Sequence, residues 1–137
     1  MTKLNKKNNV TVQIISEFEK IQAQLISLYD EISVLSKKTP DGATNIFKLK
    51  IINKVLIETN KILTDENRPF DDFETFDEVA MPSNSDIIMI LAQYISCLEK
   101  FRADHVAADL FDGKTWSWLI NGQDSGIRTA PPKKLSF

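Results

Sequence analysis

Hydrophobic residues near the start of the chain recur at alternating steps of four and three, which is the periodicity of an amphipathic helix. The positions that share this spacing are Ile14, Phe18, Ile21, Leu25, Leu28, Ile32 and Leu35. Ile15, Ile26 and Tyr29 widen the apolar stripe on one side, as a helix inside a bundle requires. The pattern predicts a helix over residues 10–37, which ends before the turn sequence Thr-Pro-Asp-Gly at 39–42.

Two further segments show the same three-four spacing. One covers residues 44–64, and the other begins near Ser83, whose hydroxyl can cap a helix that continues to about Val106. The stripe positions are Leu49, Ile52, Leu56, Thr59 and Leu63 in the first, and Ile87, Leu91, Tyr94, Leu98 and Phe101 in the second. Three matching helices with short connections favour an antiparallel three-helix bundle.

The stretch between the second and third helices, RPFDDFETFDE, has phenylalanines at every third position. Pro69 suits the first turn of a helix, and Phe70, Phe73 and Phe76 would then lie along one side of a short α- or 3₁₀-helix. Five acids would face outward, namely Asp71, Asp72, Glu74, Asp77 and Glu78. We therefore expect a short acidic helix whose rings cover the bundle and whose acids lie in solvent.

The C-terminal part alternates in a different way, because Trp116, Trp118 and Ile120 are two residues apart, as on one face of a strand. Asn121-Gly122 predicts a turn, after which residues 127–129 can return as a partner strand. The predicted fold is therefore mainly α, an antiparallel three-helix bundle with a short acidic helix between helices 2 and 3 and a C-terminal β-hairpin-like extension. Its parts are a disordered basic arm (1–9), a helical bundle domain (10–112) and an extension packed on or flanking the bundle (113–137).

Charge is unevenly distributed along the 137 residues, although the net charge is only -2. Residues 1–61 carry a net +4, residues 62–112 a net -9 and residues 113–137 a net +3. Such asymmetry concerns partners or self-association and not the fold. The single Cys97 suits a reducing compartment, and neither a signal-peptide-like start nor an apolar run of roughly 18 residues is present, so we expect a cytoplasmic protein without membrane contact.

The residue pattern gives little support to catalysis. Asp72, Asp77 and Asp86 are candidate metal ligands, but the predicted helix stripes bring no acid toward them. Gly113-Lys114-Thr115 resembles the end of a phosphate-binding loop, but position 108 is Ala where that motif has its first Gly. His105 lies close to Arg102, a pair that a helical nuclease could use. We expect no cofactor, and the sequence favours a non-enzymatic protein.

The sequence best fits a small binding protein of regulatory, inhibitory or immunity type that presents an acidic face to a basic protein partner. The candidate partner-binding residues are Asp71, Asp72, Glu74, Asp77, Glu78, Trp116 and Trp118. The charge asymmetry also allows a homo-oligomer. One alternative is a nucleic-acid-associated protein that uses Trp116, Trp118 and the nearby Lys and Arg side chains, although the acidic middle would repel phosphate. A weaker alternative is a metal-dependent helical hydrolase.

Overall fold

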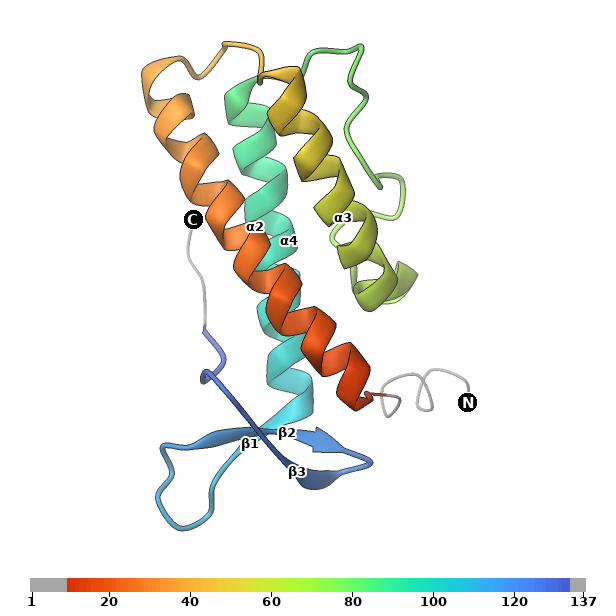
Figure 1. Cartoon of the computed structure of the whole chain (residues 1–137), viewed down its shortest axis with the longest axis vertical. Helices are drawn as coiled ribbons and strands as arrows, with labels where there is room; N and C mark the ends of the chain where they lie inside the picture. The colour runs from red at the N-terminus through yellow and green to blue at the C-terminus, as the bar shows by residue number, and fades with distance from the viewer. Residues whose placement is uncertain (1–9, 134–137) are drawn as a thin grey trace.

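The computed structural model describes residues 10–133 and consists of three helices followed by a three-stranded antiparallel sheet (Figure 1). The helices are α2 (Val12–Lys38), α3 (Ile46–Asn67) and α4 (Asn84–His105), and all three lie close to their predicted positions. The strands are β1 (Val106–Ala108), β2 (Trp116–Ile120) and β3 (Gln123–Thr129). The predicted disordered arm at 1–9 lies outside the described residues, as does the end of the predicted extension at 134–137.

Each helix begins after a residue whose side chain accepts a hydrogen bond from the first turn. Thr11 accepts from the backbone N–H of Ile14 at 3.2 Å, and Ser83 accepts from that of Asp86 at 3.2 Å. Asn45 has the same role at the start of α3. These caps satisfy backbone donors that have no partner within the helix, so the helix starts are determined by local sequence.

The predicted antiparallel bundle is wrong in the direction of its third helix. The backbone N–H of Thr44 donates to Pro82 at 3.0 Å, and that of Asn84 donates to Gly42 at 2.8 Å, so α3 and α4 begin side by side. Figure 1 shows that both then run in the same direction, and that α2 runs opposite to them. Two consecutive parallel helices need a connection that returns along the length of the first, and residues 68–83 form that connection.

The predicted short acidic helix is not present in this connection, which we call the crossover segment (residues 68–83). The reason is length. The 22 residues of α3 span about 33 Å, whereas the 16 residues of the crossover segment would rise only about 24 Å as a helix. A three-residue step of Phe also does not identify a 3₁₀-helix, because other backbone conformations have three residues per turn.

The predicted hairpin-like extension is replaced by a three-stranded sheet in the order β1-β2-β3. The additional strand forms where α4 ends, since Val106 adopts extended dihedral angles and pairs with Trp118. The turn between β2 and β3 is at the predicted Asn121-Gly122, where both residues have positive φ, at 53° and 77°. Asn and Gly tolerate this conformation better than other residues, and it matches the twist of a two-residue hairpin.

Several side chains of the sheet pack on the helical core, and the most deeply buried of them is Trp118. Trp118 on β2 is fully buried, and its ring lies edge-on to Phe18 of α2 at a centroid distance of 5.0 Å. Phe18 in turn stacks on Phe101 of α4 at 5.5 Å. Aromatic pairs at these distances add to the stability gained from burial alone, so the sheet and the helices share one hydrophobic core.

Candidate functional site

The path of the crossover segment is fixed by side chains that bind its backbone. The amide of Asn53, a buried residue of α3, donates to the carbonyl oxygen of Phe76 and accepts from its N–H, both at 2.9 Å. Asn60, two turns further along α3, donates to the carbonyl oxygen of Glu74 at 2.9 Å. Tyr94 of α4 donates to the side-chain oxygen of Asn60 at 2.8 Å. The segment is therefore held along α3 by main-chain contacts, independently of most of its own side chains.

Two of the three phenylalanines of the segment contribute to the core, as the sequence pattern suggested for all three. Phe73 and Phe76 are partly buried, and their rings meet edge-on at 5.1 Å. Phe73 also lies 6.3 Å from the ring of Tyr94. Phe70 is 38% exposed and lies outside this cluster. Burial raises the pKa of Tyr94, which keeps its hydroxyl protonated as a hydrogen-bond donor.

The acids of the segment differ in what they contact. Glu74 lies 3.5 Å from the guanidinium of Arg68, and Asp77 accepts from the backbone N–H of Val79 at 2.9 Å. Asp71 and Asp72 are exposed and form no ion pair with any residue between 10 and 133. Glu78 is partly exposed. Asp71 and Asp72 are therefore two adjacent, exposed acids without an ion pair in the described part of the chain, and they come directly before the residues whose backbone Asn53 and Asn60 bind.

The predicted tryptophan residues do not join this surface. The crossover segment runs along α3, whereas the sheet that carries Trp116 and Trp118 lies beyond the end of α4 (Figure 1). Trp118 has no exposed surface, and Trp116 is partly buried against the core. Trp118 therefore closes the core between the helices and the sheet, and its ring offers no area to a partner.

A buried charged cluster was missed by the sequence reading. Arg102 and Glu99 of α4 are 2% and 3% exposed, and Nη2 of Arg102 lies 3.5 Å from Glu99 and 3.8 Å from Glu19 of α2. Nη1 of Arg102 donates to the carbonyl oxygen of Ala130 at 3.1 Å, and the backbone N–H of Lys133 donates to Glu99 at 3.0 Å. The cluster thus joins two helices to the segment after β3. The available signal was the spacing of Glu99 and Arg102, which places opposite charges on neighbouring helical turns beside the apolar stripe.

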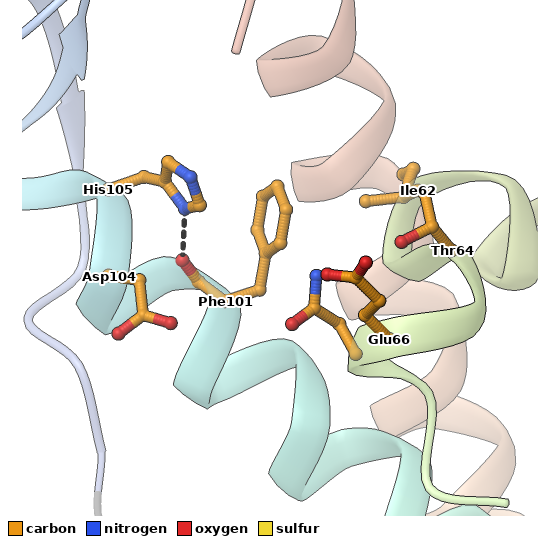
Figure 2. A pocket seen from close by; sticks show the side chains of 7 residues that line it. Ile62, Thr64, Glu66, Phe101, Asp104 and His105 are labelled. Atoms are coloured by element: carbon orange, nitrogen blue, oxygen red, sulfur yellow. Dashed lines mark hydrogen bonds between the residues drawn. The ribbon is translucent and has the colours of Figure 1, made fainter. Parts of the chain in front are cut away.

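The pair of Arg102 and His105 does not assemble as a catalytic site. His105 lines a pocket of about 60 Å³ between the ends of α3 and α4, where its Nδ1 lies 2.8 Å from the carbonyl oxygen of Phe101 (Figure 2). Arg102 is directed instead toward Glu19 and Glu99. Small-molecule sites usually enclose roughly 300 Å³ or more, so this pocket accommodates little more than water.

Thr64 also lines this pocket, and its backbone conformation is unusual. Its φ of 59° and ψ of 178° interrupt the helical geometry of α3. A non-glycine residue in this region of backbone conformation is strained.

Among residues 10–133, no group of three or more His, Cys, Asp or Glu side chains is arranged to hold a metal ion. The candidate ligands Asp72, Asp77 and Asp86 therefore do not form such a group.

Comparison of the chain with protein-family models, curated proteins and solved structures finds no match. None of the helices in the described part of the chain combines the length and the apolar character that crossing a membrane requires.

Proposed function

We propose that this chain is a small non-enzymatic binding protein of regulatory, inhibitory or immunity type, and that its crossover segment docks on a basic surface of a partner protein. The observation that carries the proposal is that Asp71 and Asp72 are exposed and unpaired and come directly before Glu74 and Phe76, whose backbone Asn60 and Asn53 hold in place.

Two physical effects support this function, one electrostatic and one entropic. The crossover segment holds five acids and one arginine, a net charge of -4, and a concentrated charge of one sign attracts an oppositely charged partner and raises the association rate. A segment that is already ordered also loses less conformational freedom on binding than a flexible loop does. Both effects act at the crossover segment, where the acids and the fixed backbone coincide.

The nucleic-acid alternative is not proposed, because one of the two aromatic side chains on which it depends is unable to stack on a base. Trp118 is enclosed between the helices and the sheet, and its indole N–H is already bonded to Glu19 at 2.9 Å. Base stacking needs an open ring face.

The test uses a pair of double variants with the same change in net charge. Asp71→Lys/Asp72→Lys reverses the proposed surface, whereas Asp30→Lys/Asp41→Lys reverses two exposed acids elsewhere. Each protein captures partners from a lysate of its native host, and mass spectrometry identifies them. We expect a basic partner to be captured by the wild type and by the control, but not by Asp71→Lys/Asp72→Lys.

Association kinetics with the identified partner then distinguishes long-range electrostatic steering from short-range contact in the complex. The association rate of the wild type should fall between ~0.05 and ~0.5 M salt, because the Debye length shrinks. The rate of Asp71→Lys/Asp72→Lys should be low at both concentrations. Equal rates for the two double variants at low salt would overturn the proposal and leave the acids as an ordinary solvated surface.

A further inference from the structure

A shallow groove follows the exposed side of α2, and we call it the α2 groove (residues 22–34). It has a volume of about 690 Å³, and all the residues that line it belong to α2, from Gln22 to Val34. Binding sites commonly have volumes of roughly 300–1,000 Å³. Because a single helix forms the lining, the groove is open along its length, and this shape suits an extended chain segment better than an enclosed small molecule.

The α2 groove combines apolar surface with negative charge. Ile26 is half-buried and Val34 is 55% exposed, so two apolar side chains lie along it. Asp30 lies between them, is exposed and forms no ion pair with any residue between 10 and 133. Glu31 also lines the groove, but its charge is balanced by Lys48 at 3.2 Å. The groove therefore offers apolar contacts and one unbalanced acid.

The described part of the chain leads into this groove. The hydroxyl of Thr129 donates to Glu19 of α2 at 2.6 Å, and four residues later the backbone N–H of Lys133 donates to Glu99 at 3.0 Å. Glu99 also accepts a hydrogen bond from Gln22, which lines the groove. The chain thus passes from the level of Glu19 to that of Gln22, and its course is directed toward the middle of the groove.

The residues that come next in the chain match the groove in character. Residues 134–137, which lie outside the described residues, have the sequence Lys-Leu-Ser-Phe. Leu135 and Phe137 are two positions apart, which places their side chains on the same side of an extended chain. Lys134 and the exposed Lys133 carry charge that is opposite in sign to the unbalanced acid of the groove.

The length of this segment also fits the groove. An extended chain advances about 3.3 Å per residue and an α-helix about 1.5 Å. Leu135 is therefore about 7 Å beyond the last described residue, and Ile26 is about 6 Å beyond Gln22. Phe137 is about 13 Å along the same path, from where its ring can reach toward Val34, about 18 Å beyond Gln22.

We propose that the α2 groove is the docking site of residues 134–137 of the same chain, bound in an extended conformation. In this arrangement Leu135 packs on Ile26, and Phe137 packs beside Val34. Burial of these apolar side chains stabilises the contact, and the attraction between the lysines and the acid of the groove fixes its register. The inference concerns a surface other than the crossover segment and goes beyond the proposed function.

A pair of engineered disulfides tests the direction of the segment. Both are made in Cys97→Ala, so that no native thiol competes. Ser27→Cys/Ser136→Cys places one thiol in the groove, whereas Ser16→Cys/Ser136→Cys places it at an exposed position of α2 before the groove. Ser27 and Ser16 are about 8 and 9 Å along the helix from Gln22, in opposite directions, so an undocked segment has a similar distance to reach either.

The rate at which each disulfide closes is the measurement. At ~10 μM protein under mild oxidation, the pair with Ser27→Cys should close within the monomer roughly tenfold faster than the pair with Ser16→Cys, because docking raises the effective concentration of the thiol. Phe137→Ser should abolish this difference, whereas the control Phe70→Ser, which changes a 38% exposed ring of the crossover segment, should preserve it. Non-reducing electrophoresis and peptide mapping by mass spectrometry identify the bonds.

Chemical shifts provide a second test that needs no cysteine. Leu135→Ser/Phe137→Ser should move the backbone amide signals of residues 23–34 in NMR spectra of the full chain, because the groove loses its apolar occupant. The control is Leu110→Ser/Phe111→Ser, which changes two side chains that are 97% and 100% exposed in the loop between β1 and β2. This control should leave the signals of residues 23–34 unchanged.

Three outcomes would overturn the proposal. Equal closure rates for the two disulfides would show that the groove does not bind the segment, as would unchanged amide signals in Leu135→Ser/Phe137→Ser. Disulfides that join two chains at ~10 μM would assign the groove to the segment of a second copy. Asp71→Lys/Asp72→Lys should leave both closure rates unchanged, so this inference and the proposed function fail independently.

Discussion

The indole Nε1 of Trp118 donates a hydrogen bond of 2.9 Å to Glu19, a residue of α2 that lies 99 positions earlier in the chain. The same carboxylate oxygen accepts from the hydroxyl of Thr129 at 2.6 Å, and the other oxygen lies 3.8 Å from Arg102. One side chain therefore connects the first helix to two strands and to the buried guanidinium. Glu19 thus provides polar contacts that attach the sheet to the helices, in addition to the packing of Trp118.

Replacement of Glu19 by alanine should lower the free energy of unfolding by about 2–5 kcal/mol. The change leaves the Trp118 N–H without its acceptor and the Arg102 charge with one carboxylate instead of two, and unpaired buried groups are costly. Glu17→Ala, an exposed position on the same helix, should change stability by less than about 0.5 kcal/mol. Chemical denaturation of both variants provides the comparison, and equal stabilities would remove the structural role of Glu19.

Asn53→Ala should both destabilise the protein and release the crossover segment. Two backbone groups of Phe76 lose their partner, at a cost of about 1–3 kcal/mol for each group that stays dry. Limited proteolysis should then cut residues 68–83 faster than in the wild type, because a segment that opens locally enters the active site of a protease more easily. Asn67→Ala, which changes an exposed asparagine of α3, is the control and should leave the cleavage rate unchanged.

Stability and binding should separate within the crossover segment. Phe73→Ala should cost about 1.5–3 kcal/mol, because its ring is partly buried against Phe76 and Tyr94, whereas the more exposed Phe70 should contribute less. Asp72→Lys should change stability by less than about 0.5 kcal/mol. Denaturant titration of Phe73→Ala, Phe70→Ala and Asp72→Lys measures the three free energies of unfolding. A loss for Asp72→Lys as large as that for Phe73→Ala would show that the acid has a structural partner.

Leu25→Ala and Leu91→Ala should each cost about 2–5 kcal/mol, because both side chains are fully buried between helices. Val34→Ala on the outer side of α2, where the side chain is 55% exposed, should cost far less. Thermal and chemical denaturation of the three proteins would test the arrangement of the core. Tolerance of either leucine truncation would contradict it.

Asp112 should titrate well below an ordinary aspartate. The hydroxyl and the backbone N–H of Thr115 bind its carboxylate, and they lower its pKa from 3.8 to about 2. The order that this carboxylate gives to the loop is therefore present above the ordinary pKa and is lost as the pH falls through about 2.

The measurement is an NMR titration of the carboxyl groups from pH ~5 to ~1.5. In Thr115→Val, which keeps the backbone N–H and removes the hydroxyl, the pKa of Asp112 should move back toward 3.8. Thr75→Val in the crossover segment is the control and should leave it unchanged. An Asp112 pKa near 3.8 in the wild type would mean that the loop is not held in the described conformation.

The helices could be predicted from sequence because spacing and capping are local. The stripe that contains Leu25 and the cap at Ser83 each depend on residues within a few turns. The direction of α4 was not predictable in this way, since a three-four stripe reads the same whichever way the helix runs. It depends on contacts such as that between Thr44 and Pro82, which join distant parts of the chain.

The errors at the candidate site have a common cause. The three-residue step of Phe70, Phe73 and Phe76 was interpreted as helical, although an extended path along α3 also places two of them on the core. The burial of Glu99 and Arg102 was not predicted, because it becomes evident only when Glu19 and the segment after β3 are in place. Burial of a charge is a tertiary property that composition and spacing do not contain.

Asn53 and Asn60 recognise main-chain atoms of the crossover segment, and this has an evolutionary consequence. These contacts are to the main chain of Phe76 and Glu74, so substitutions at the neighbouring exposed positions 71 and 72 leave them unchanged. The segment can therefore exchange its exposed side chains, and with them its partner preference, while its course along α3 stays constant. Among relatives of this chain, we expect residues 53 and 60 to be retained and residues 71 and 72 to diversify.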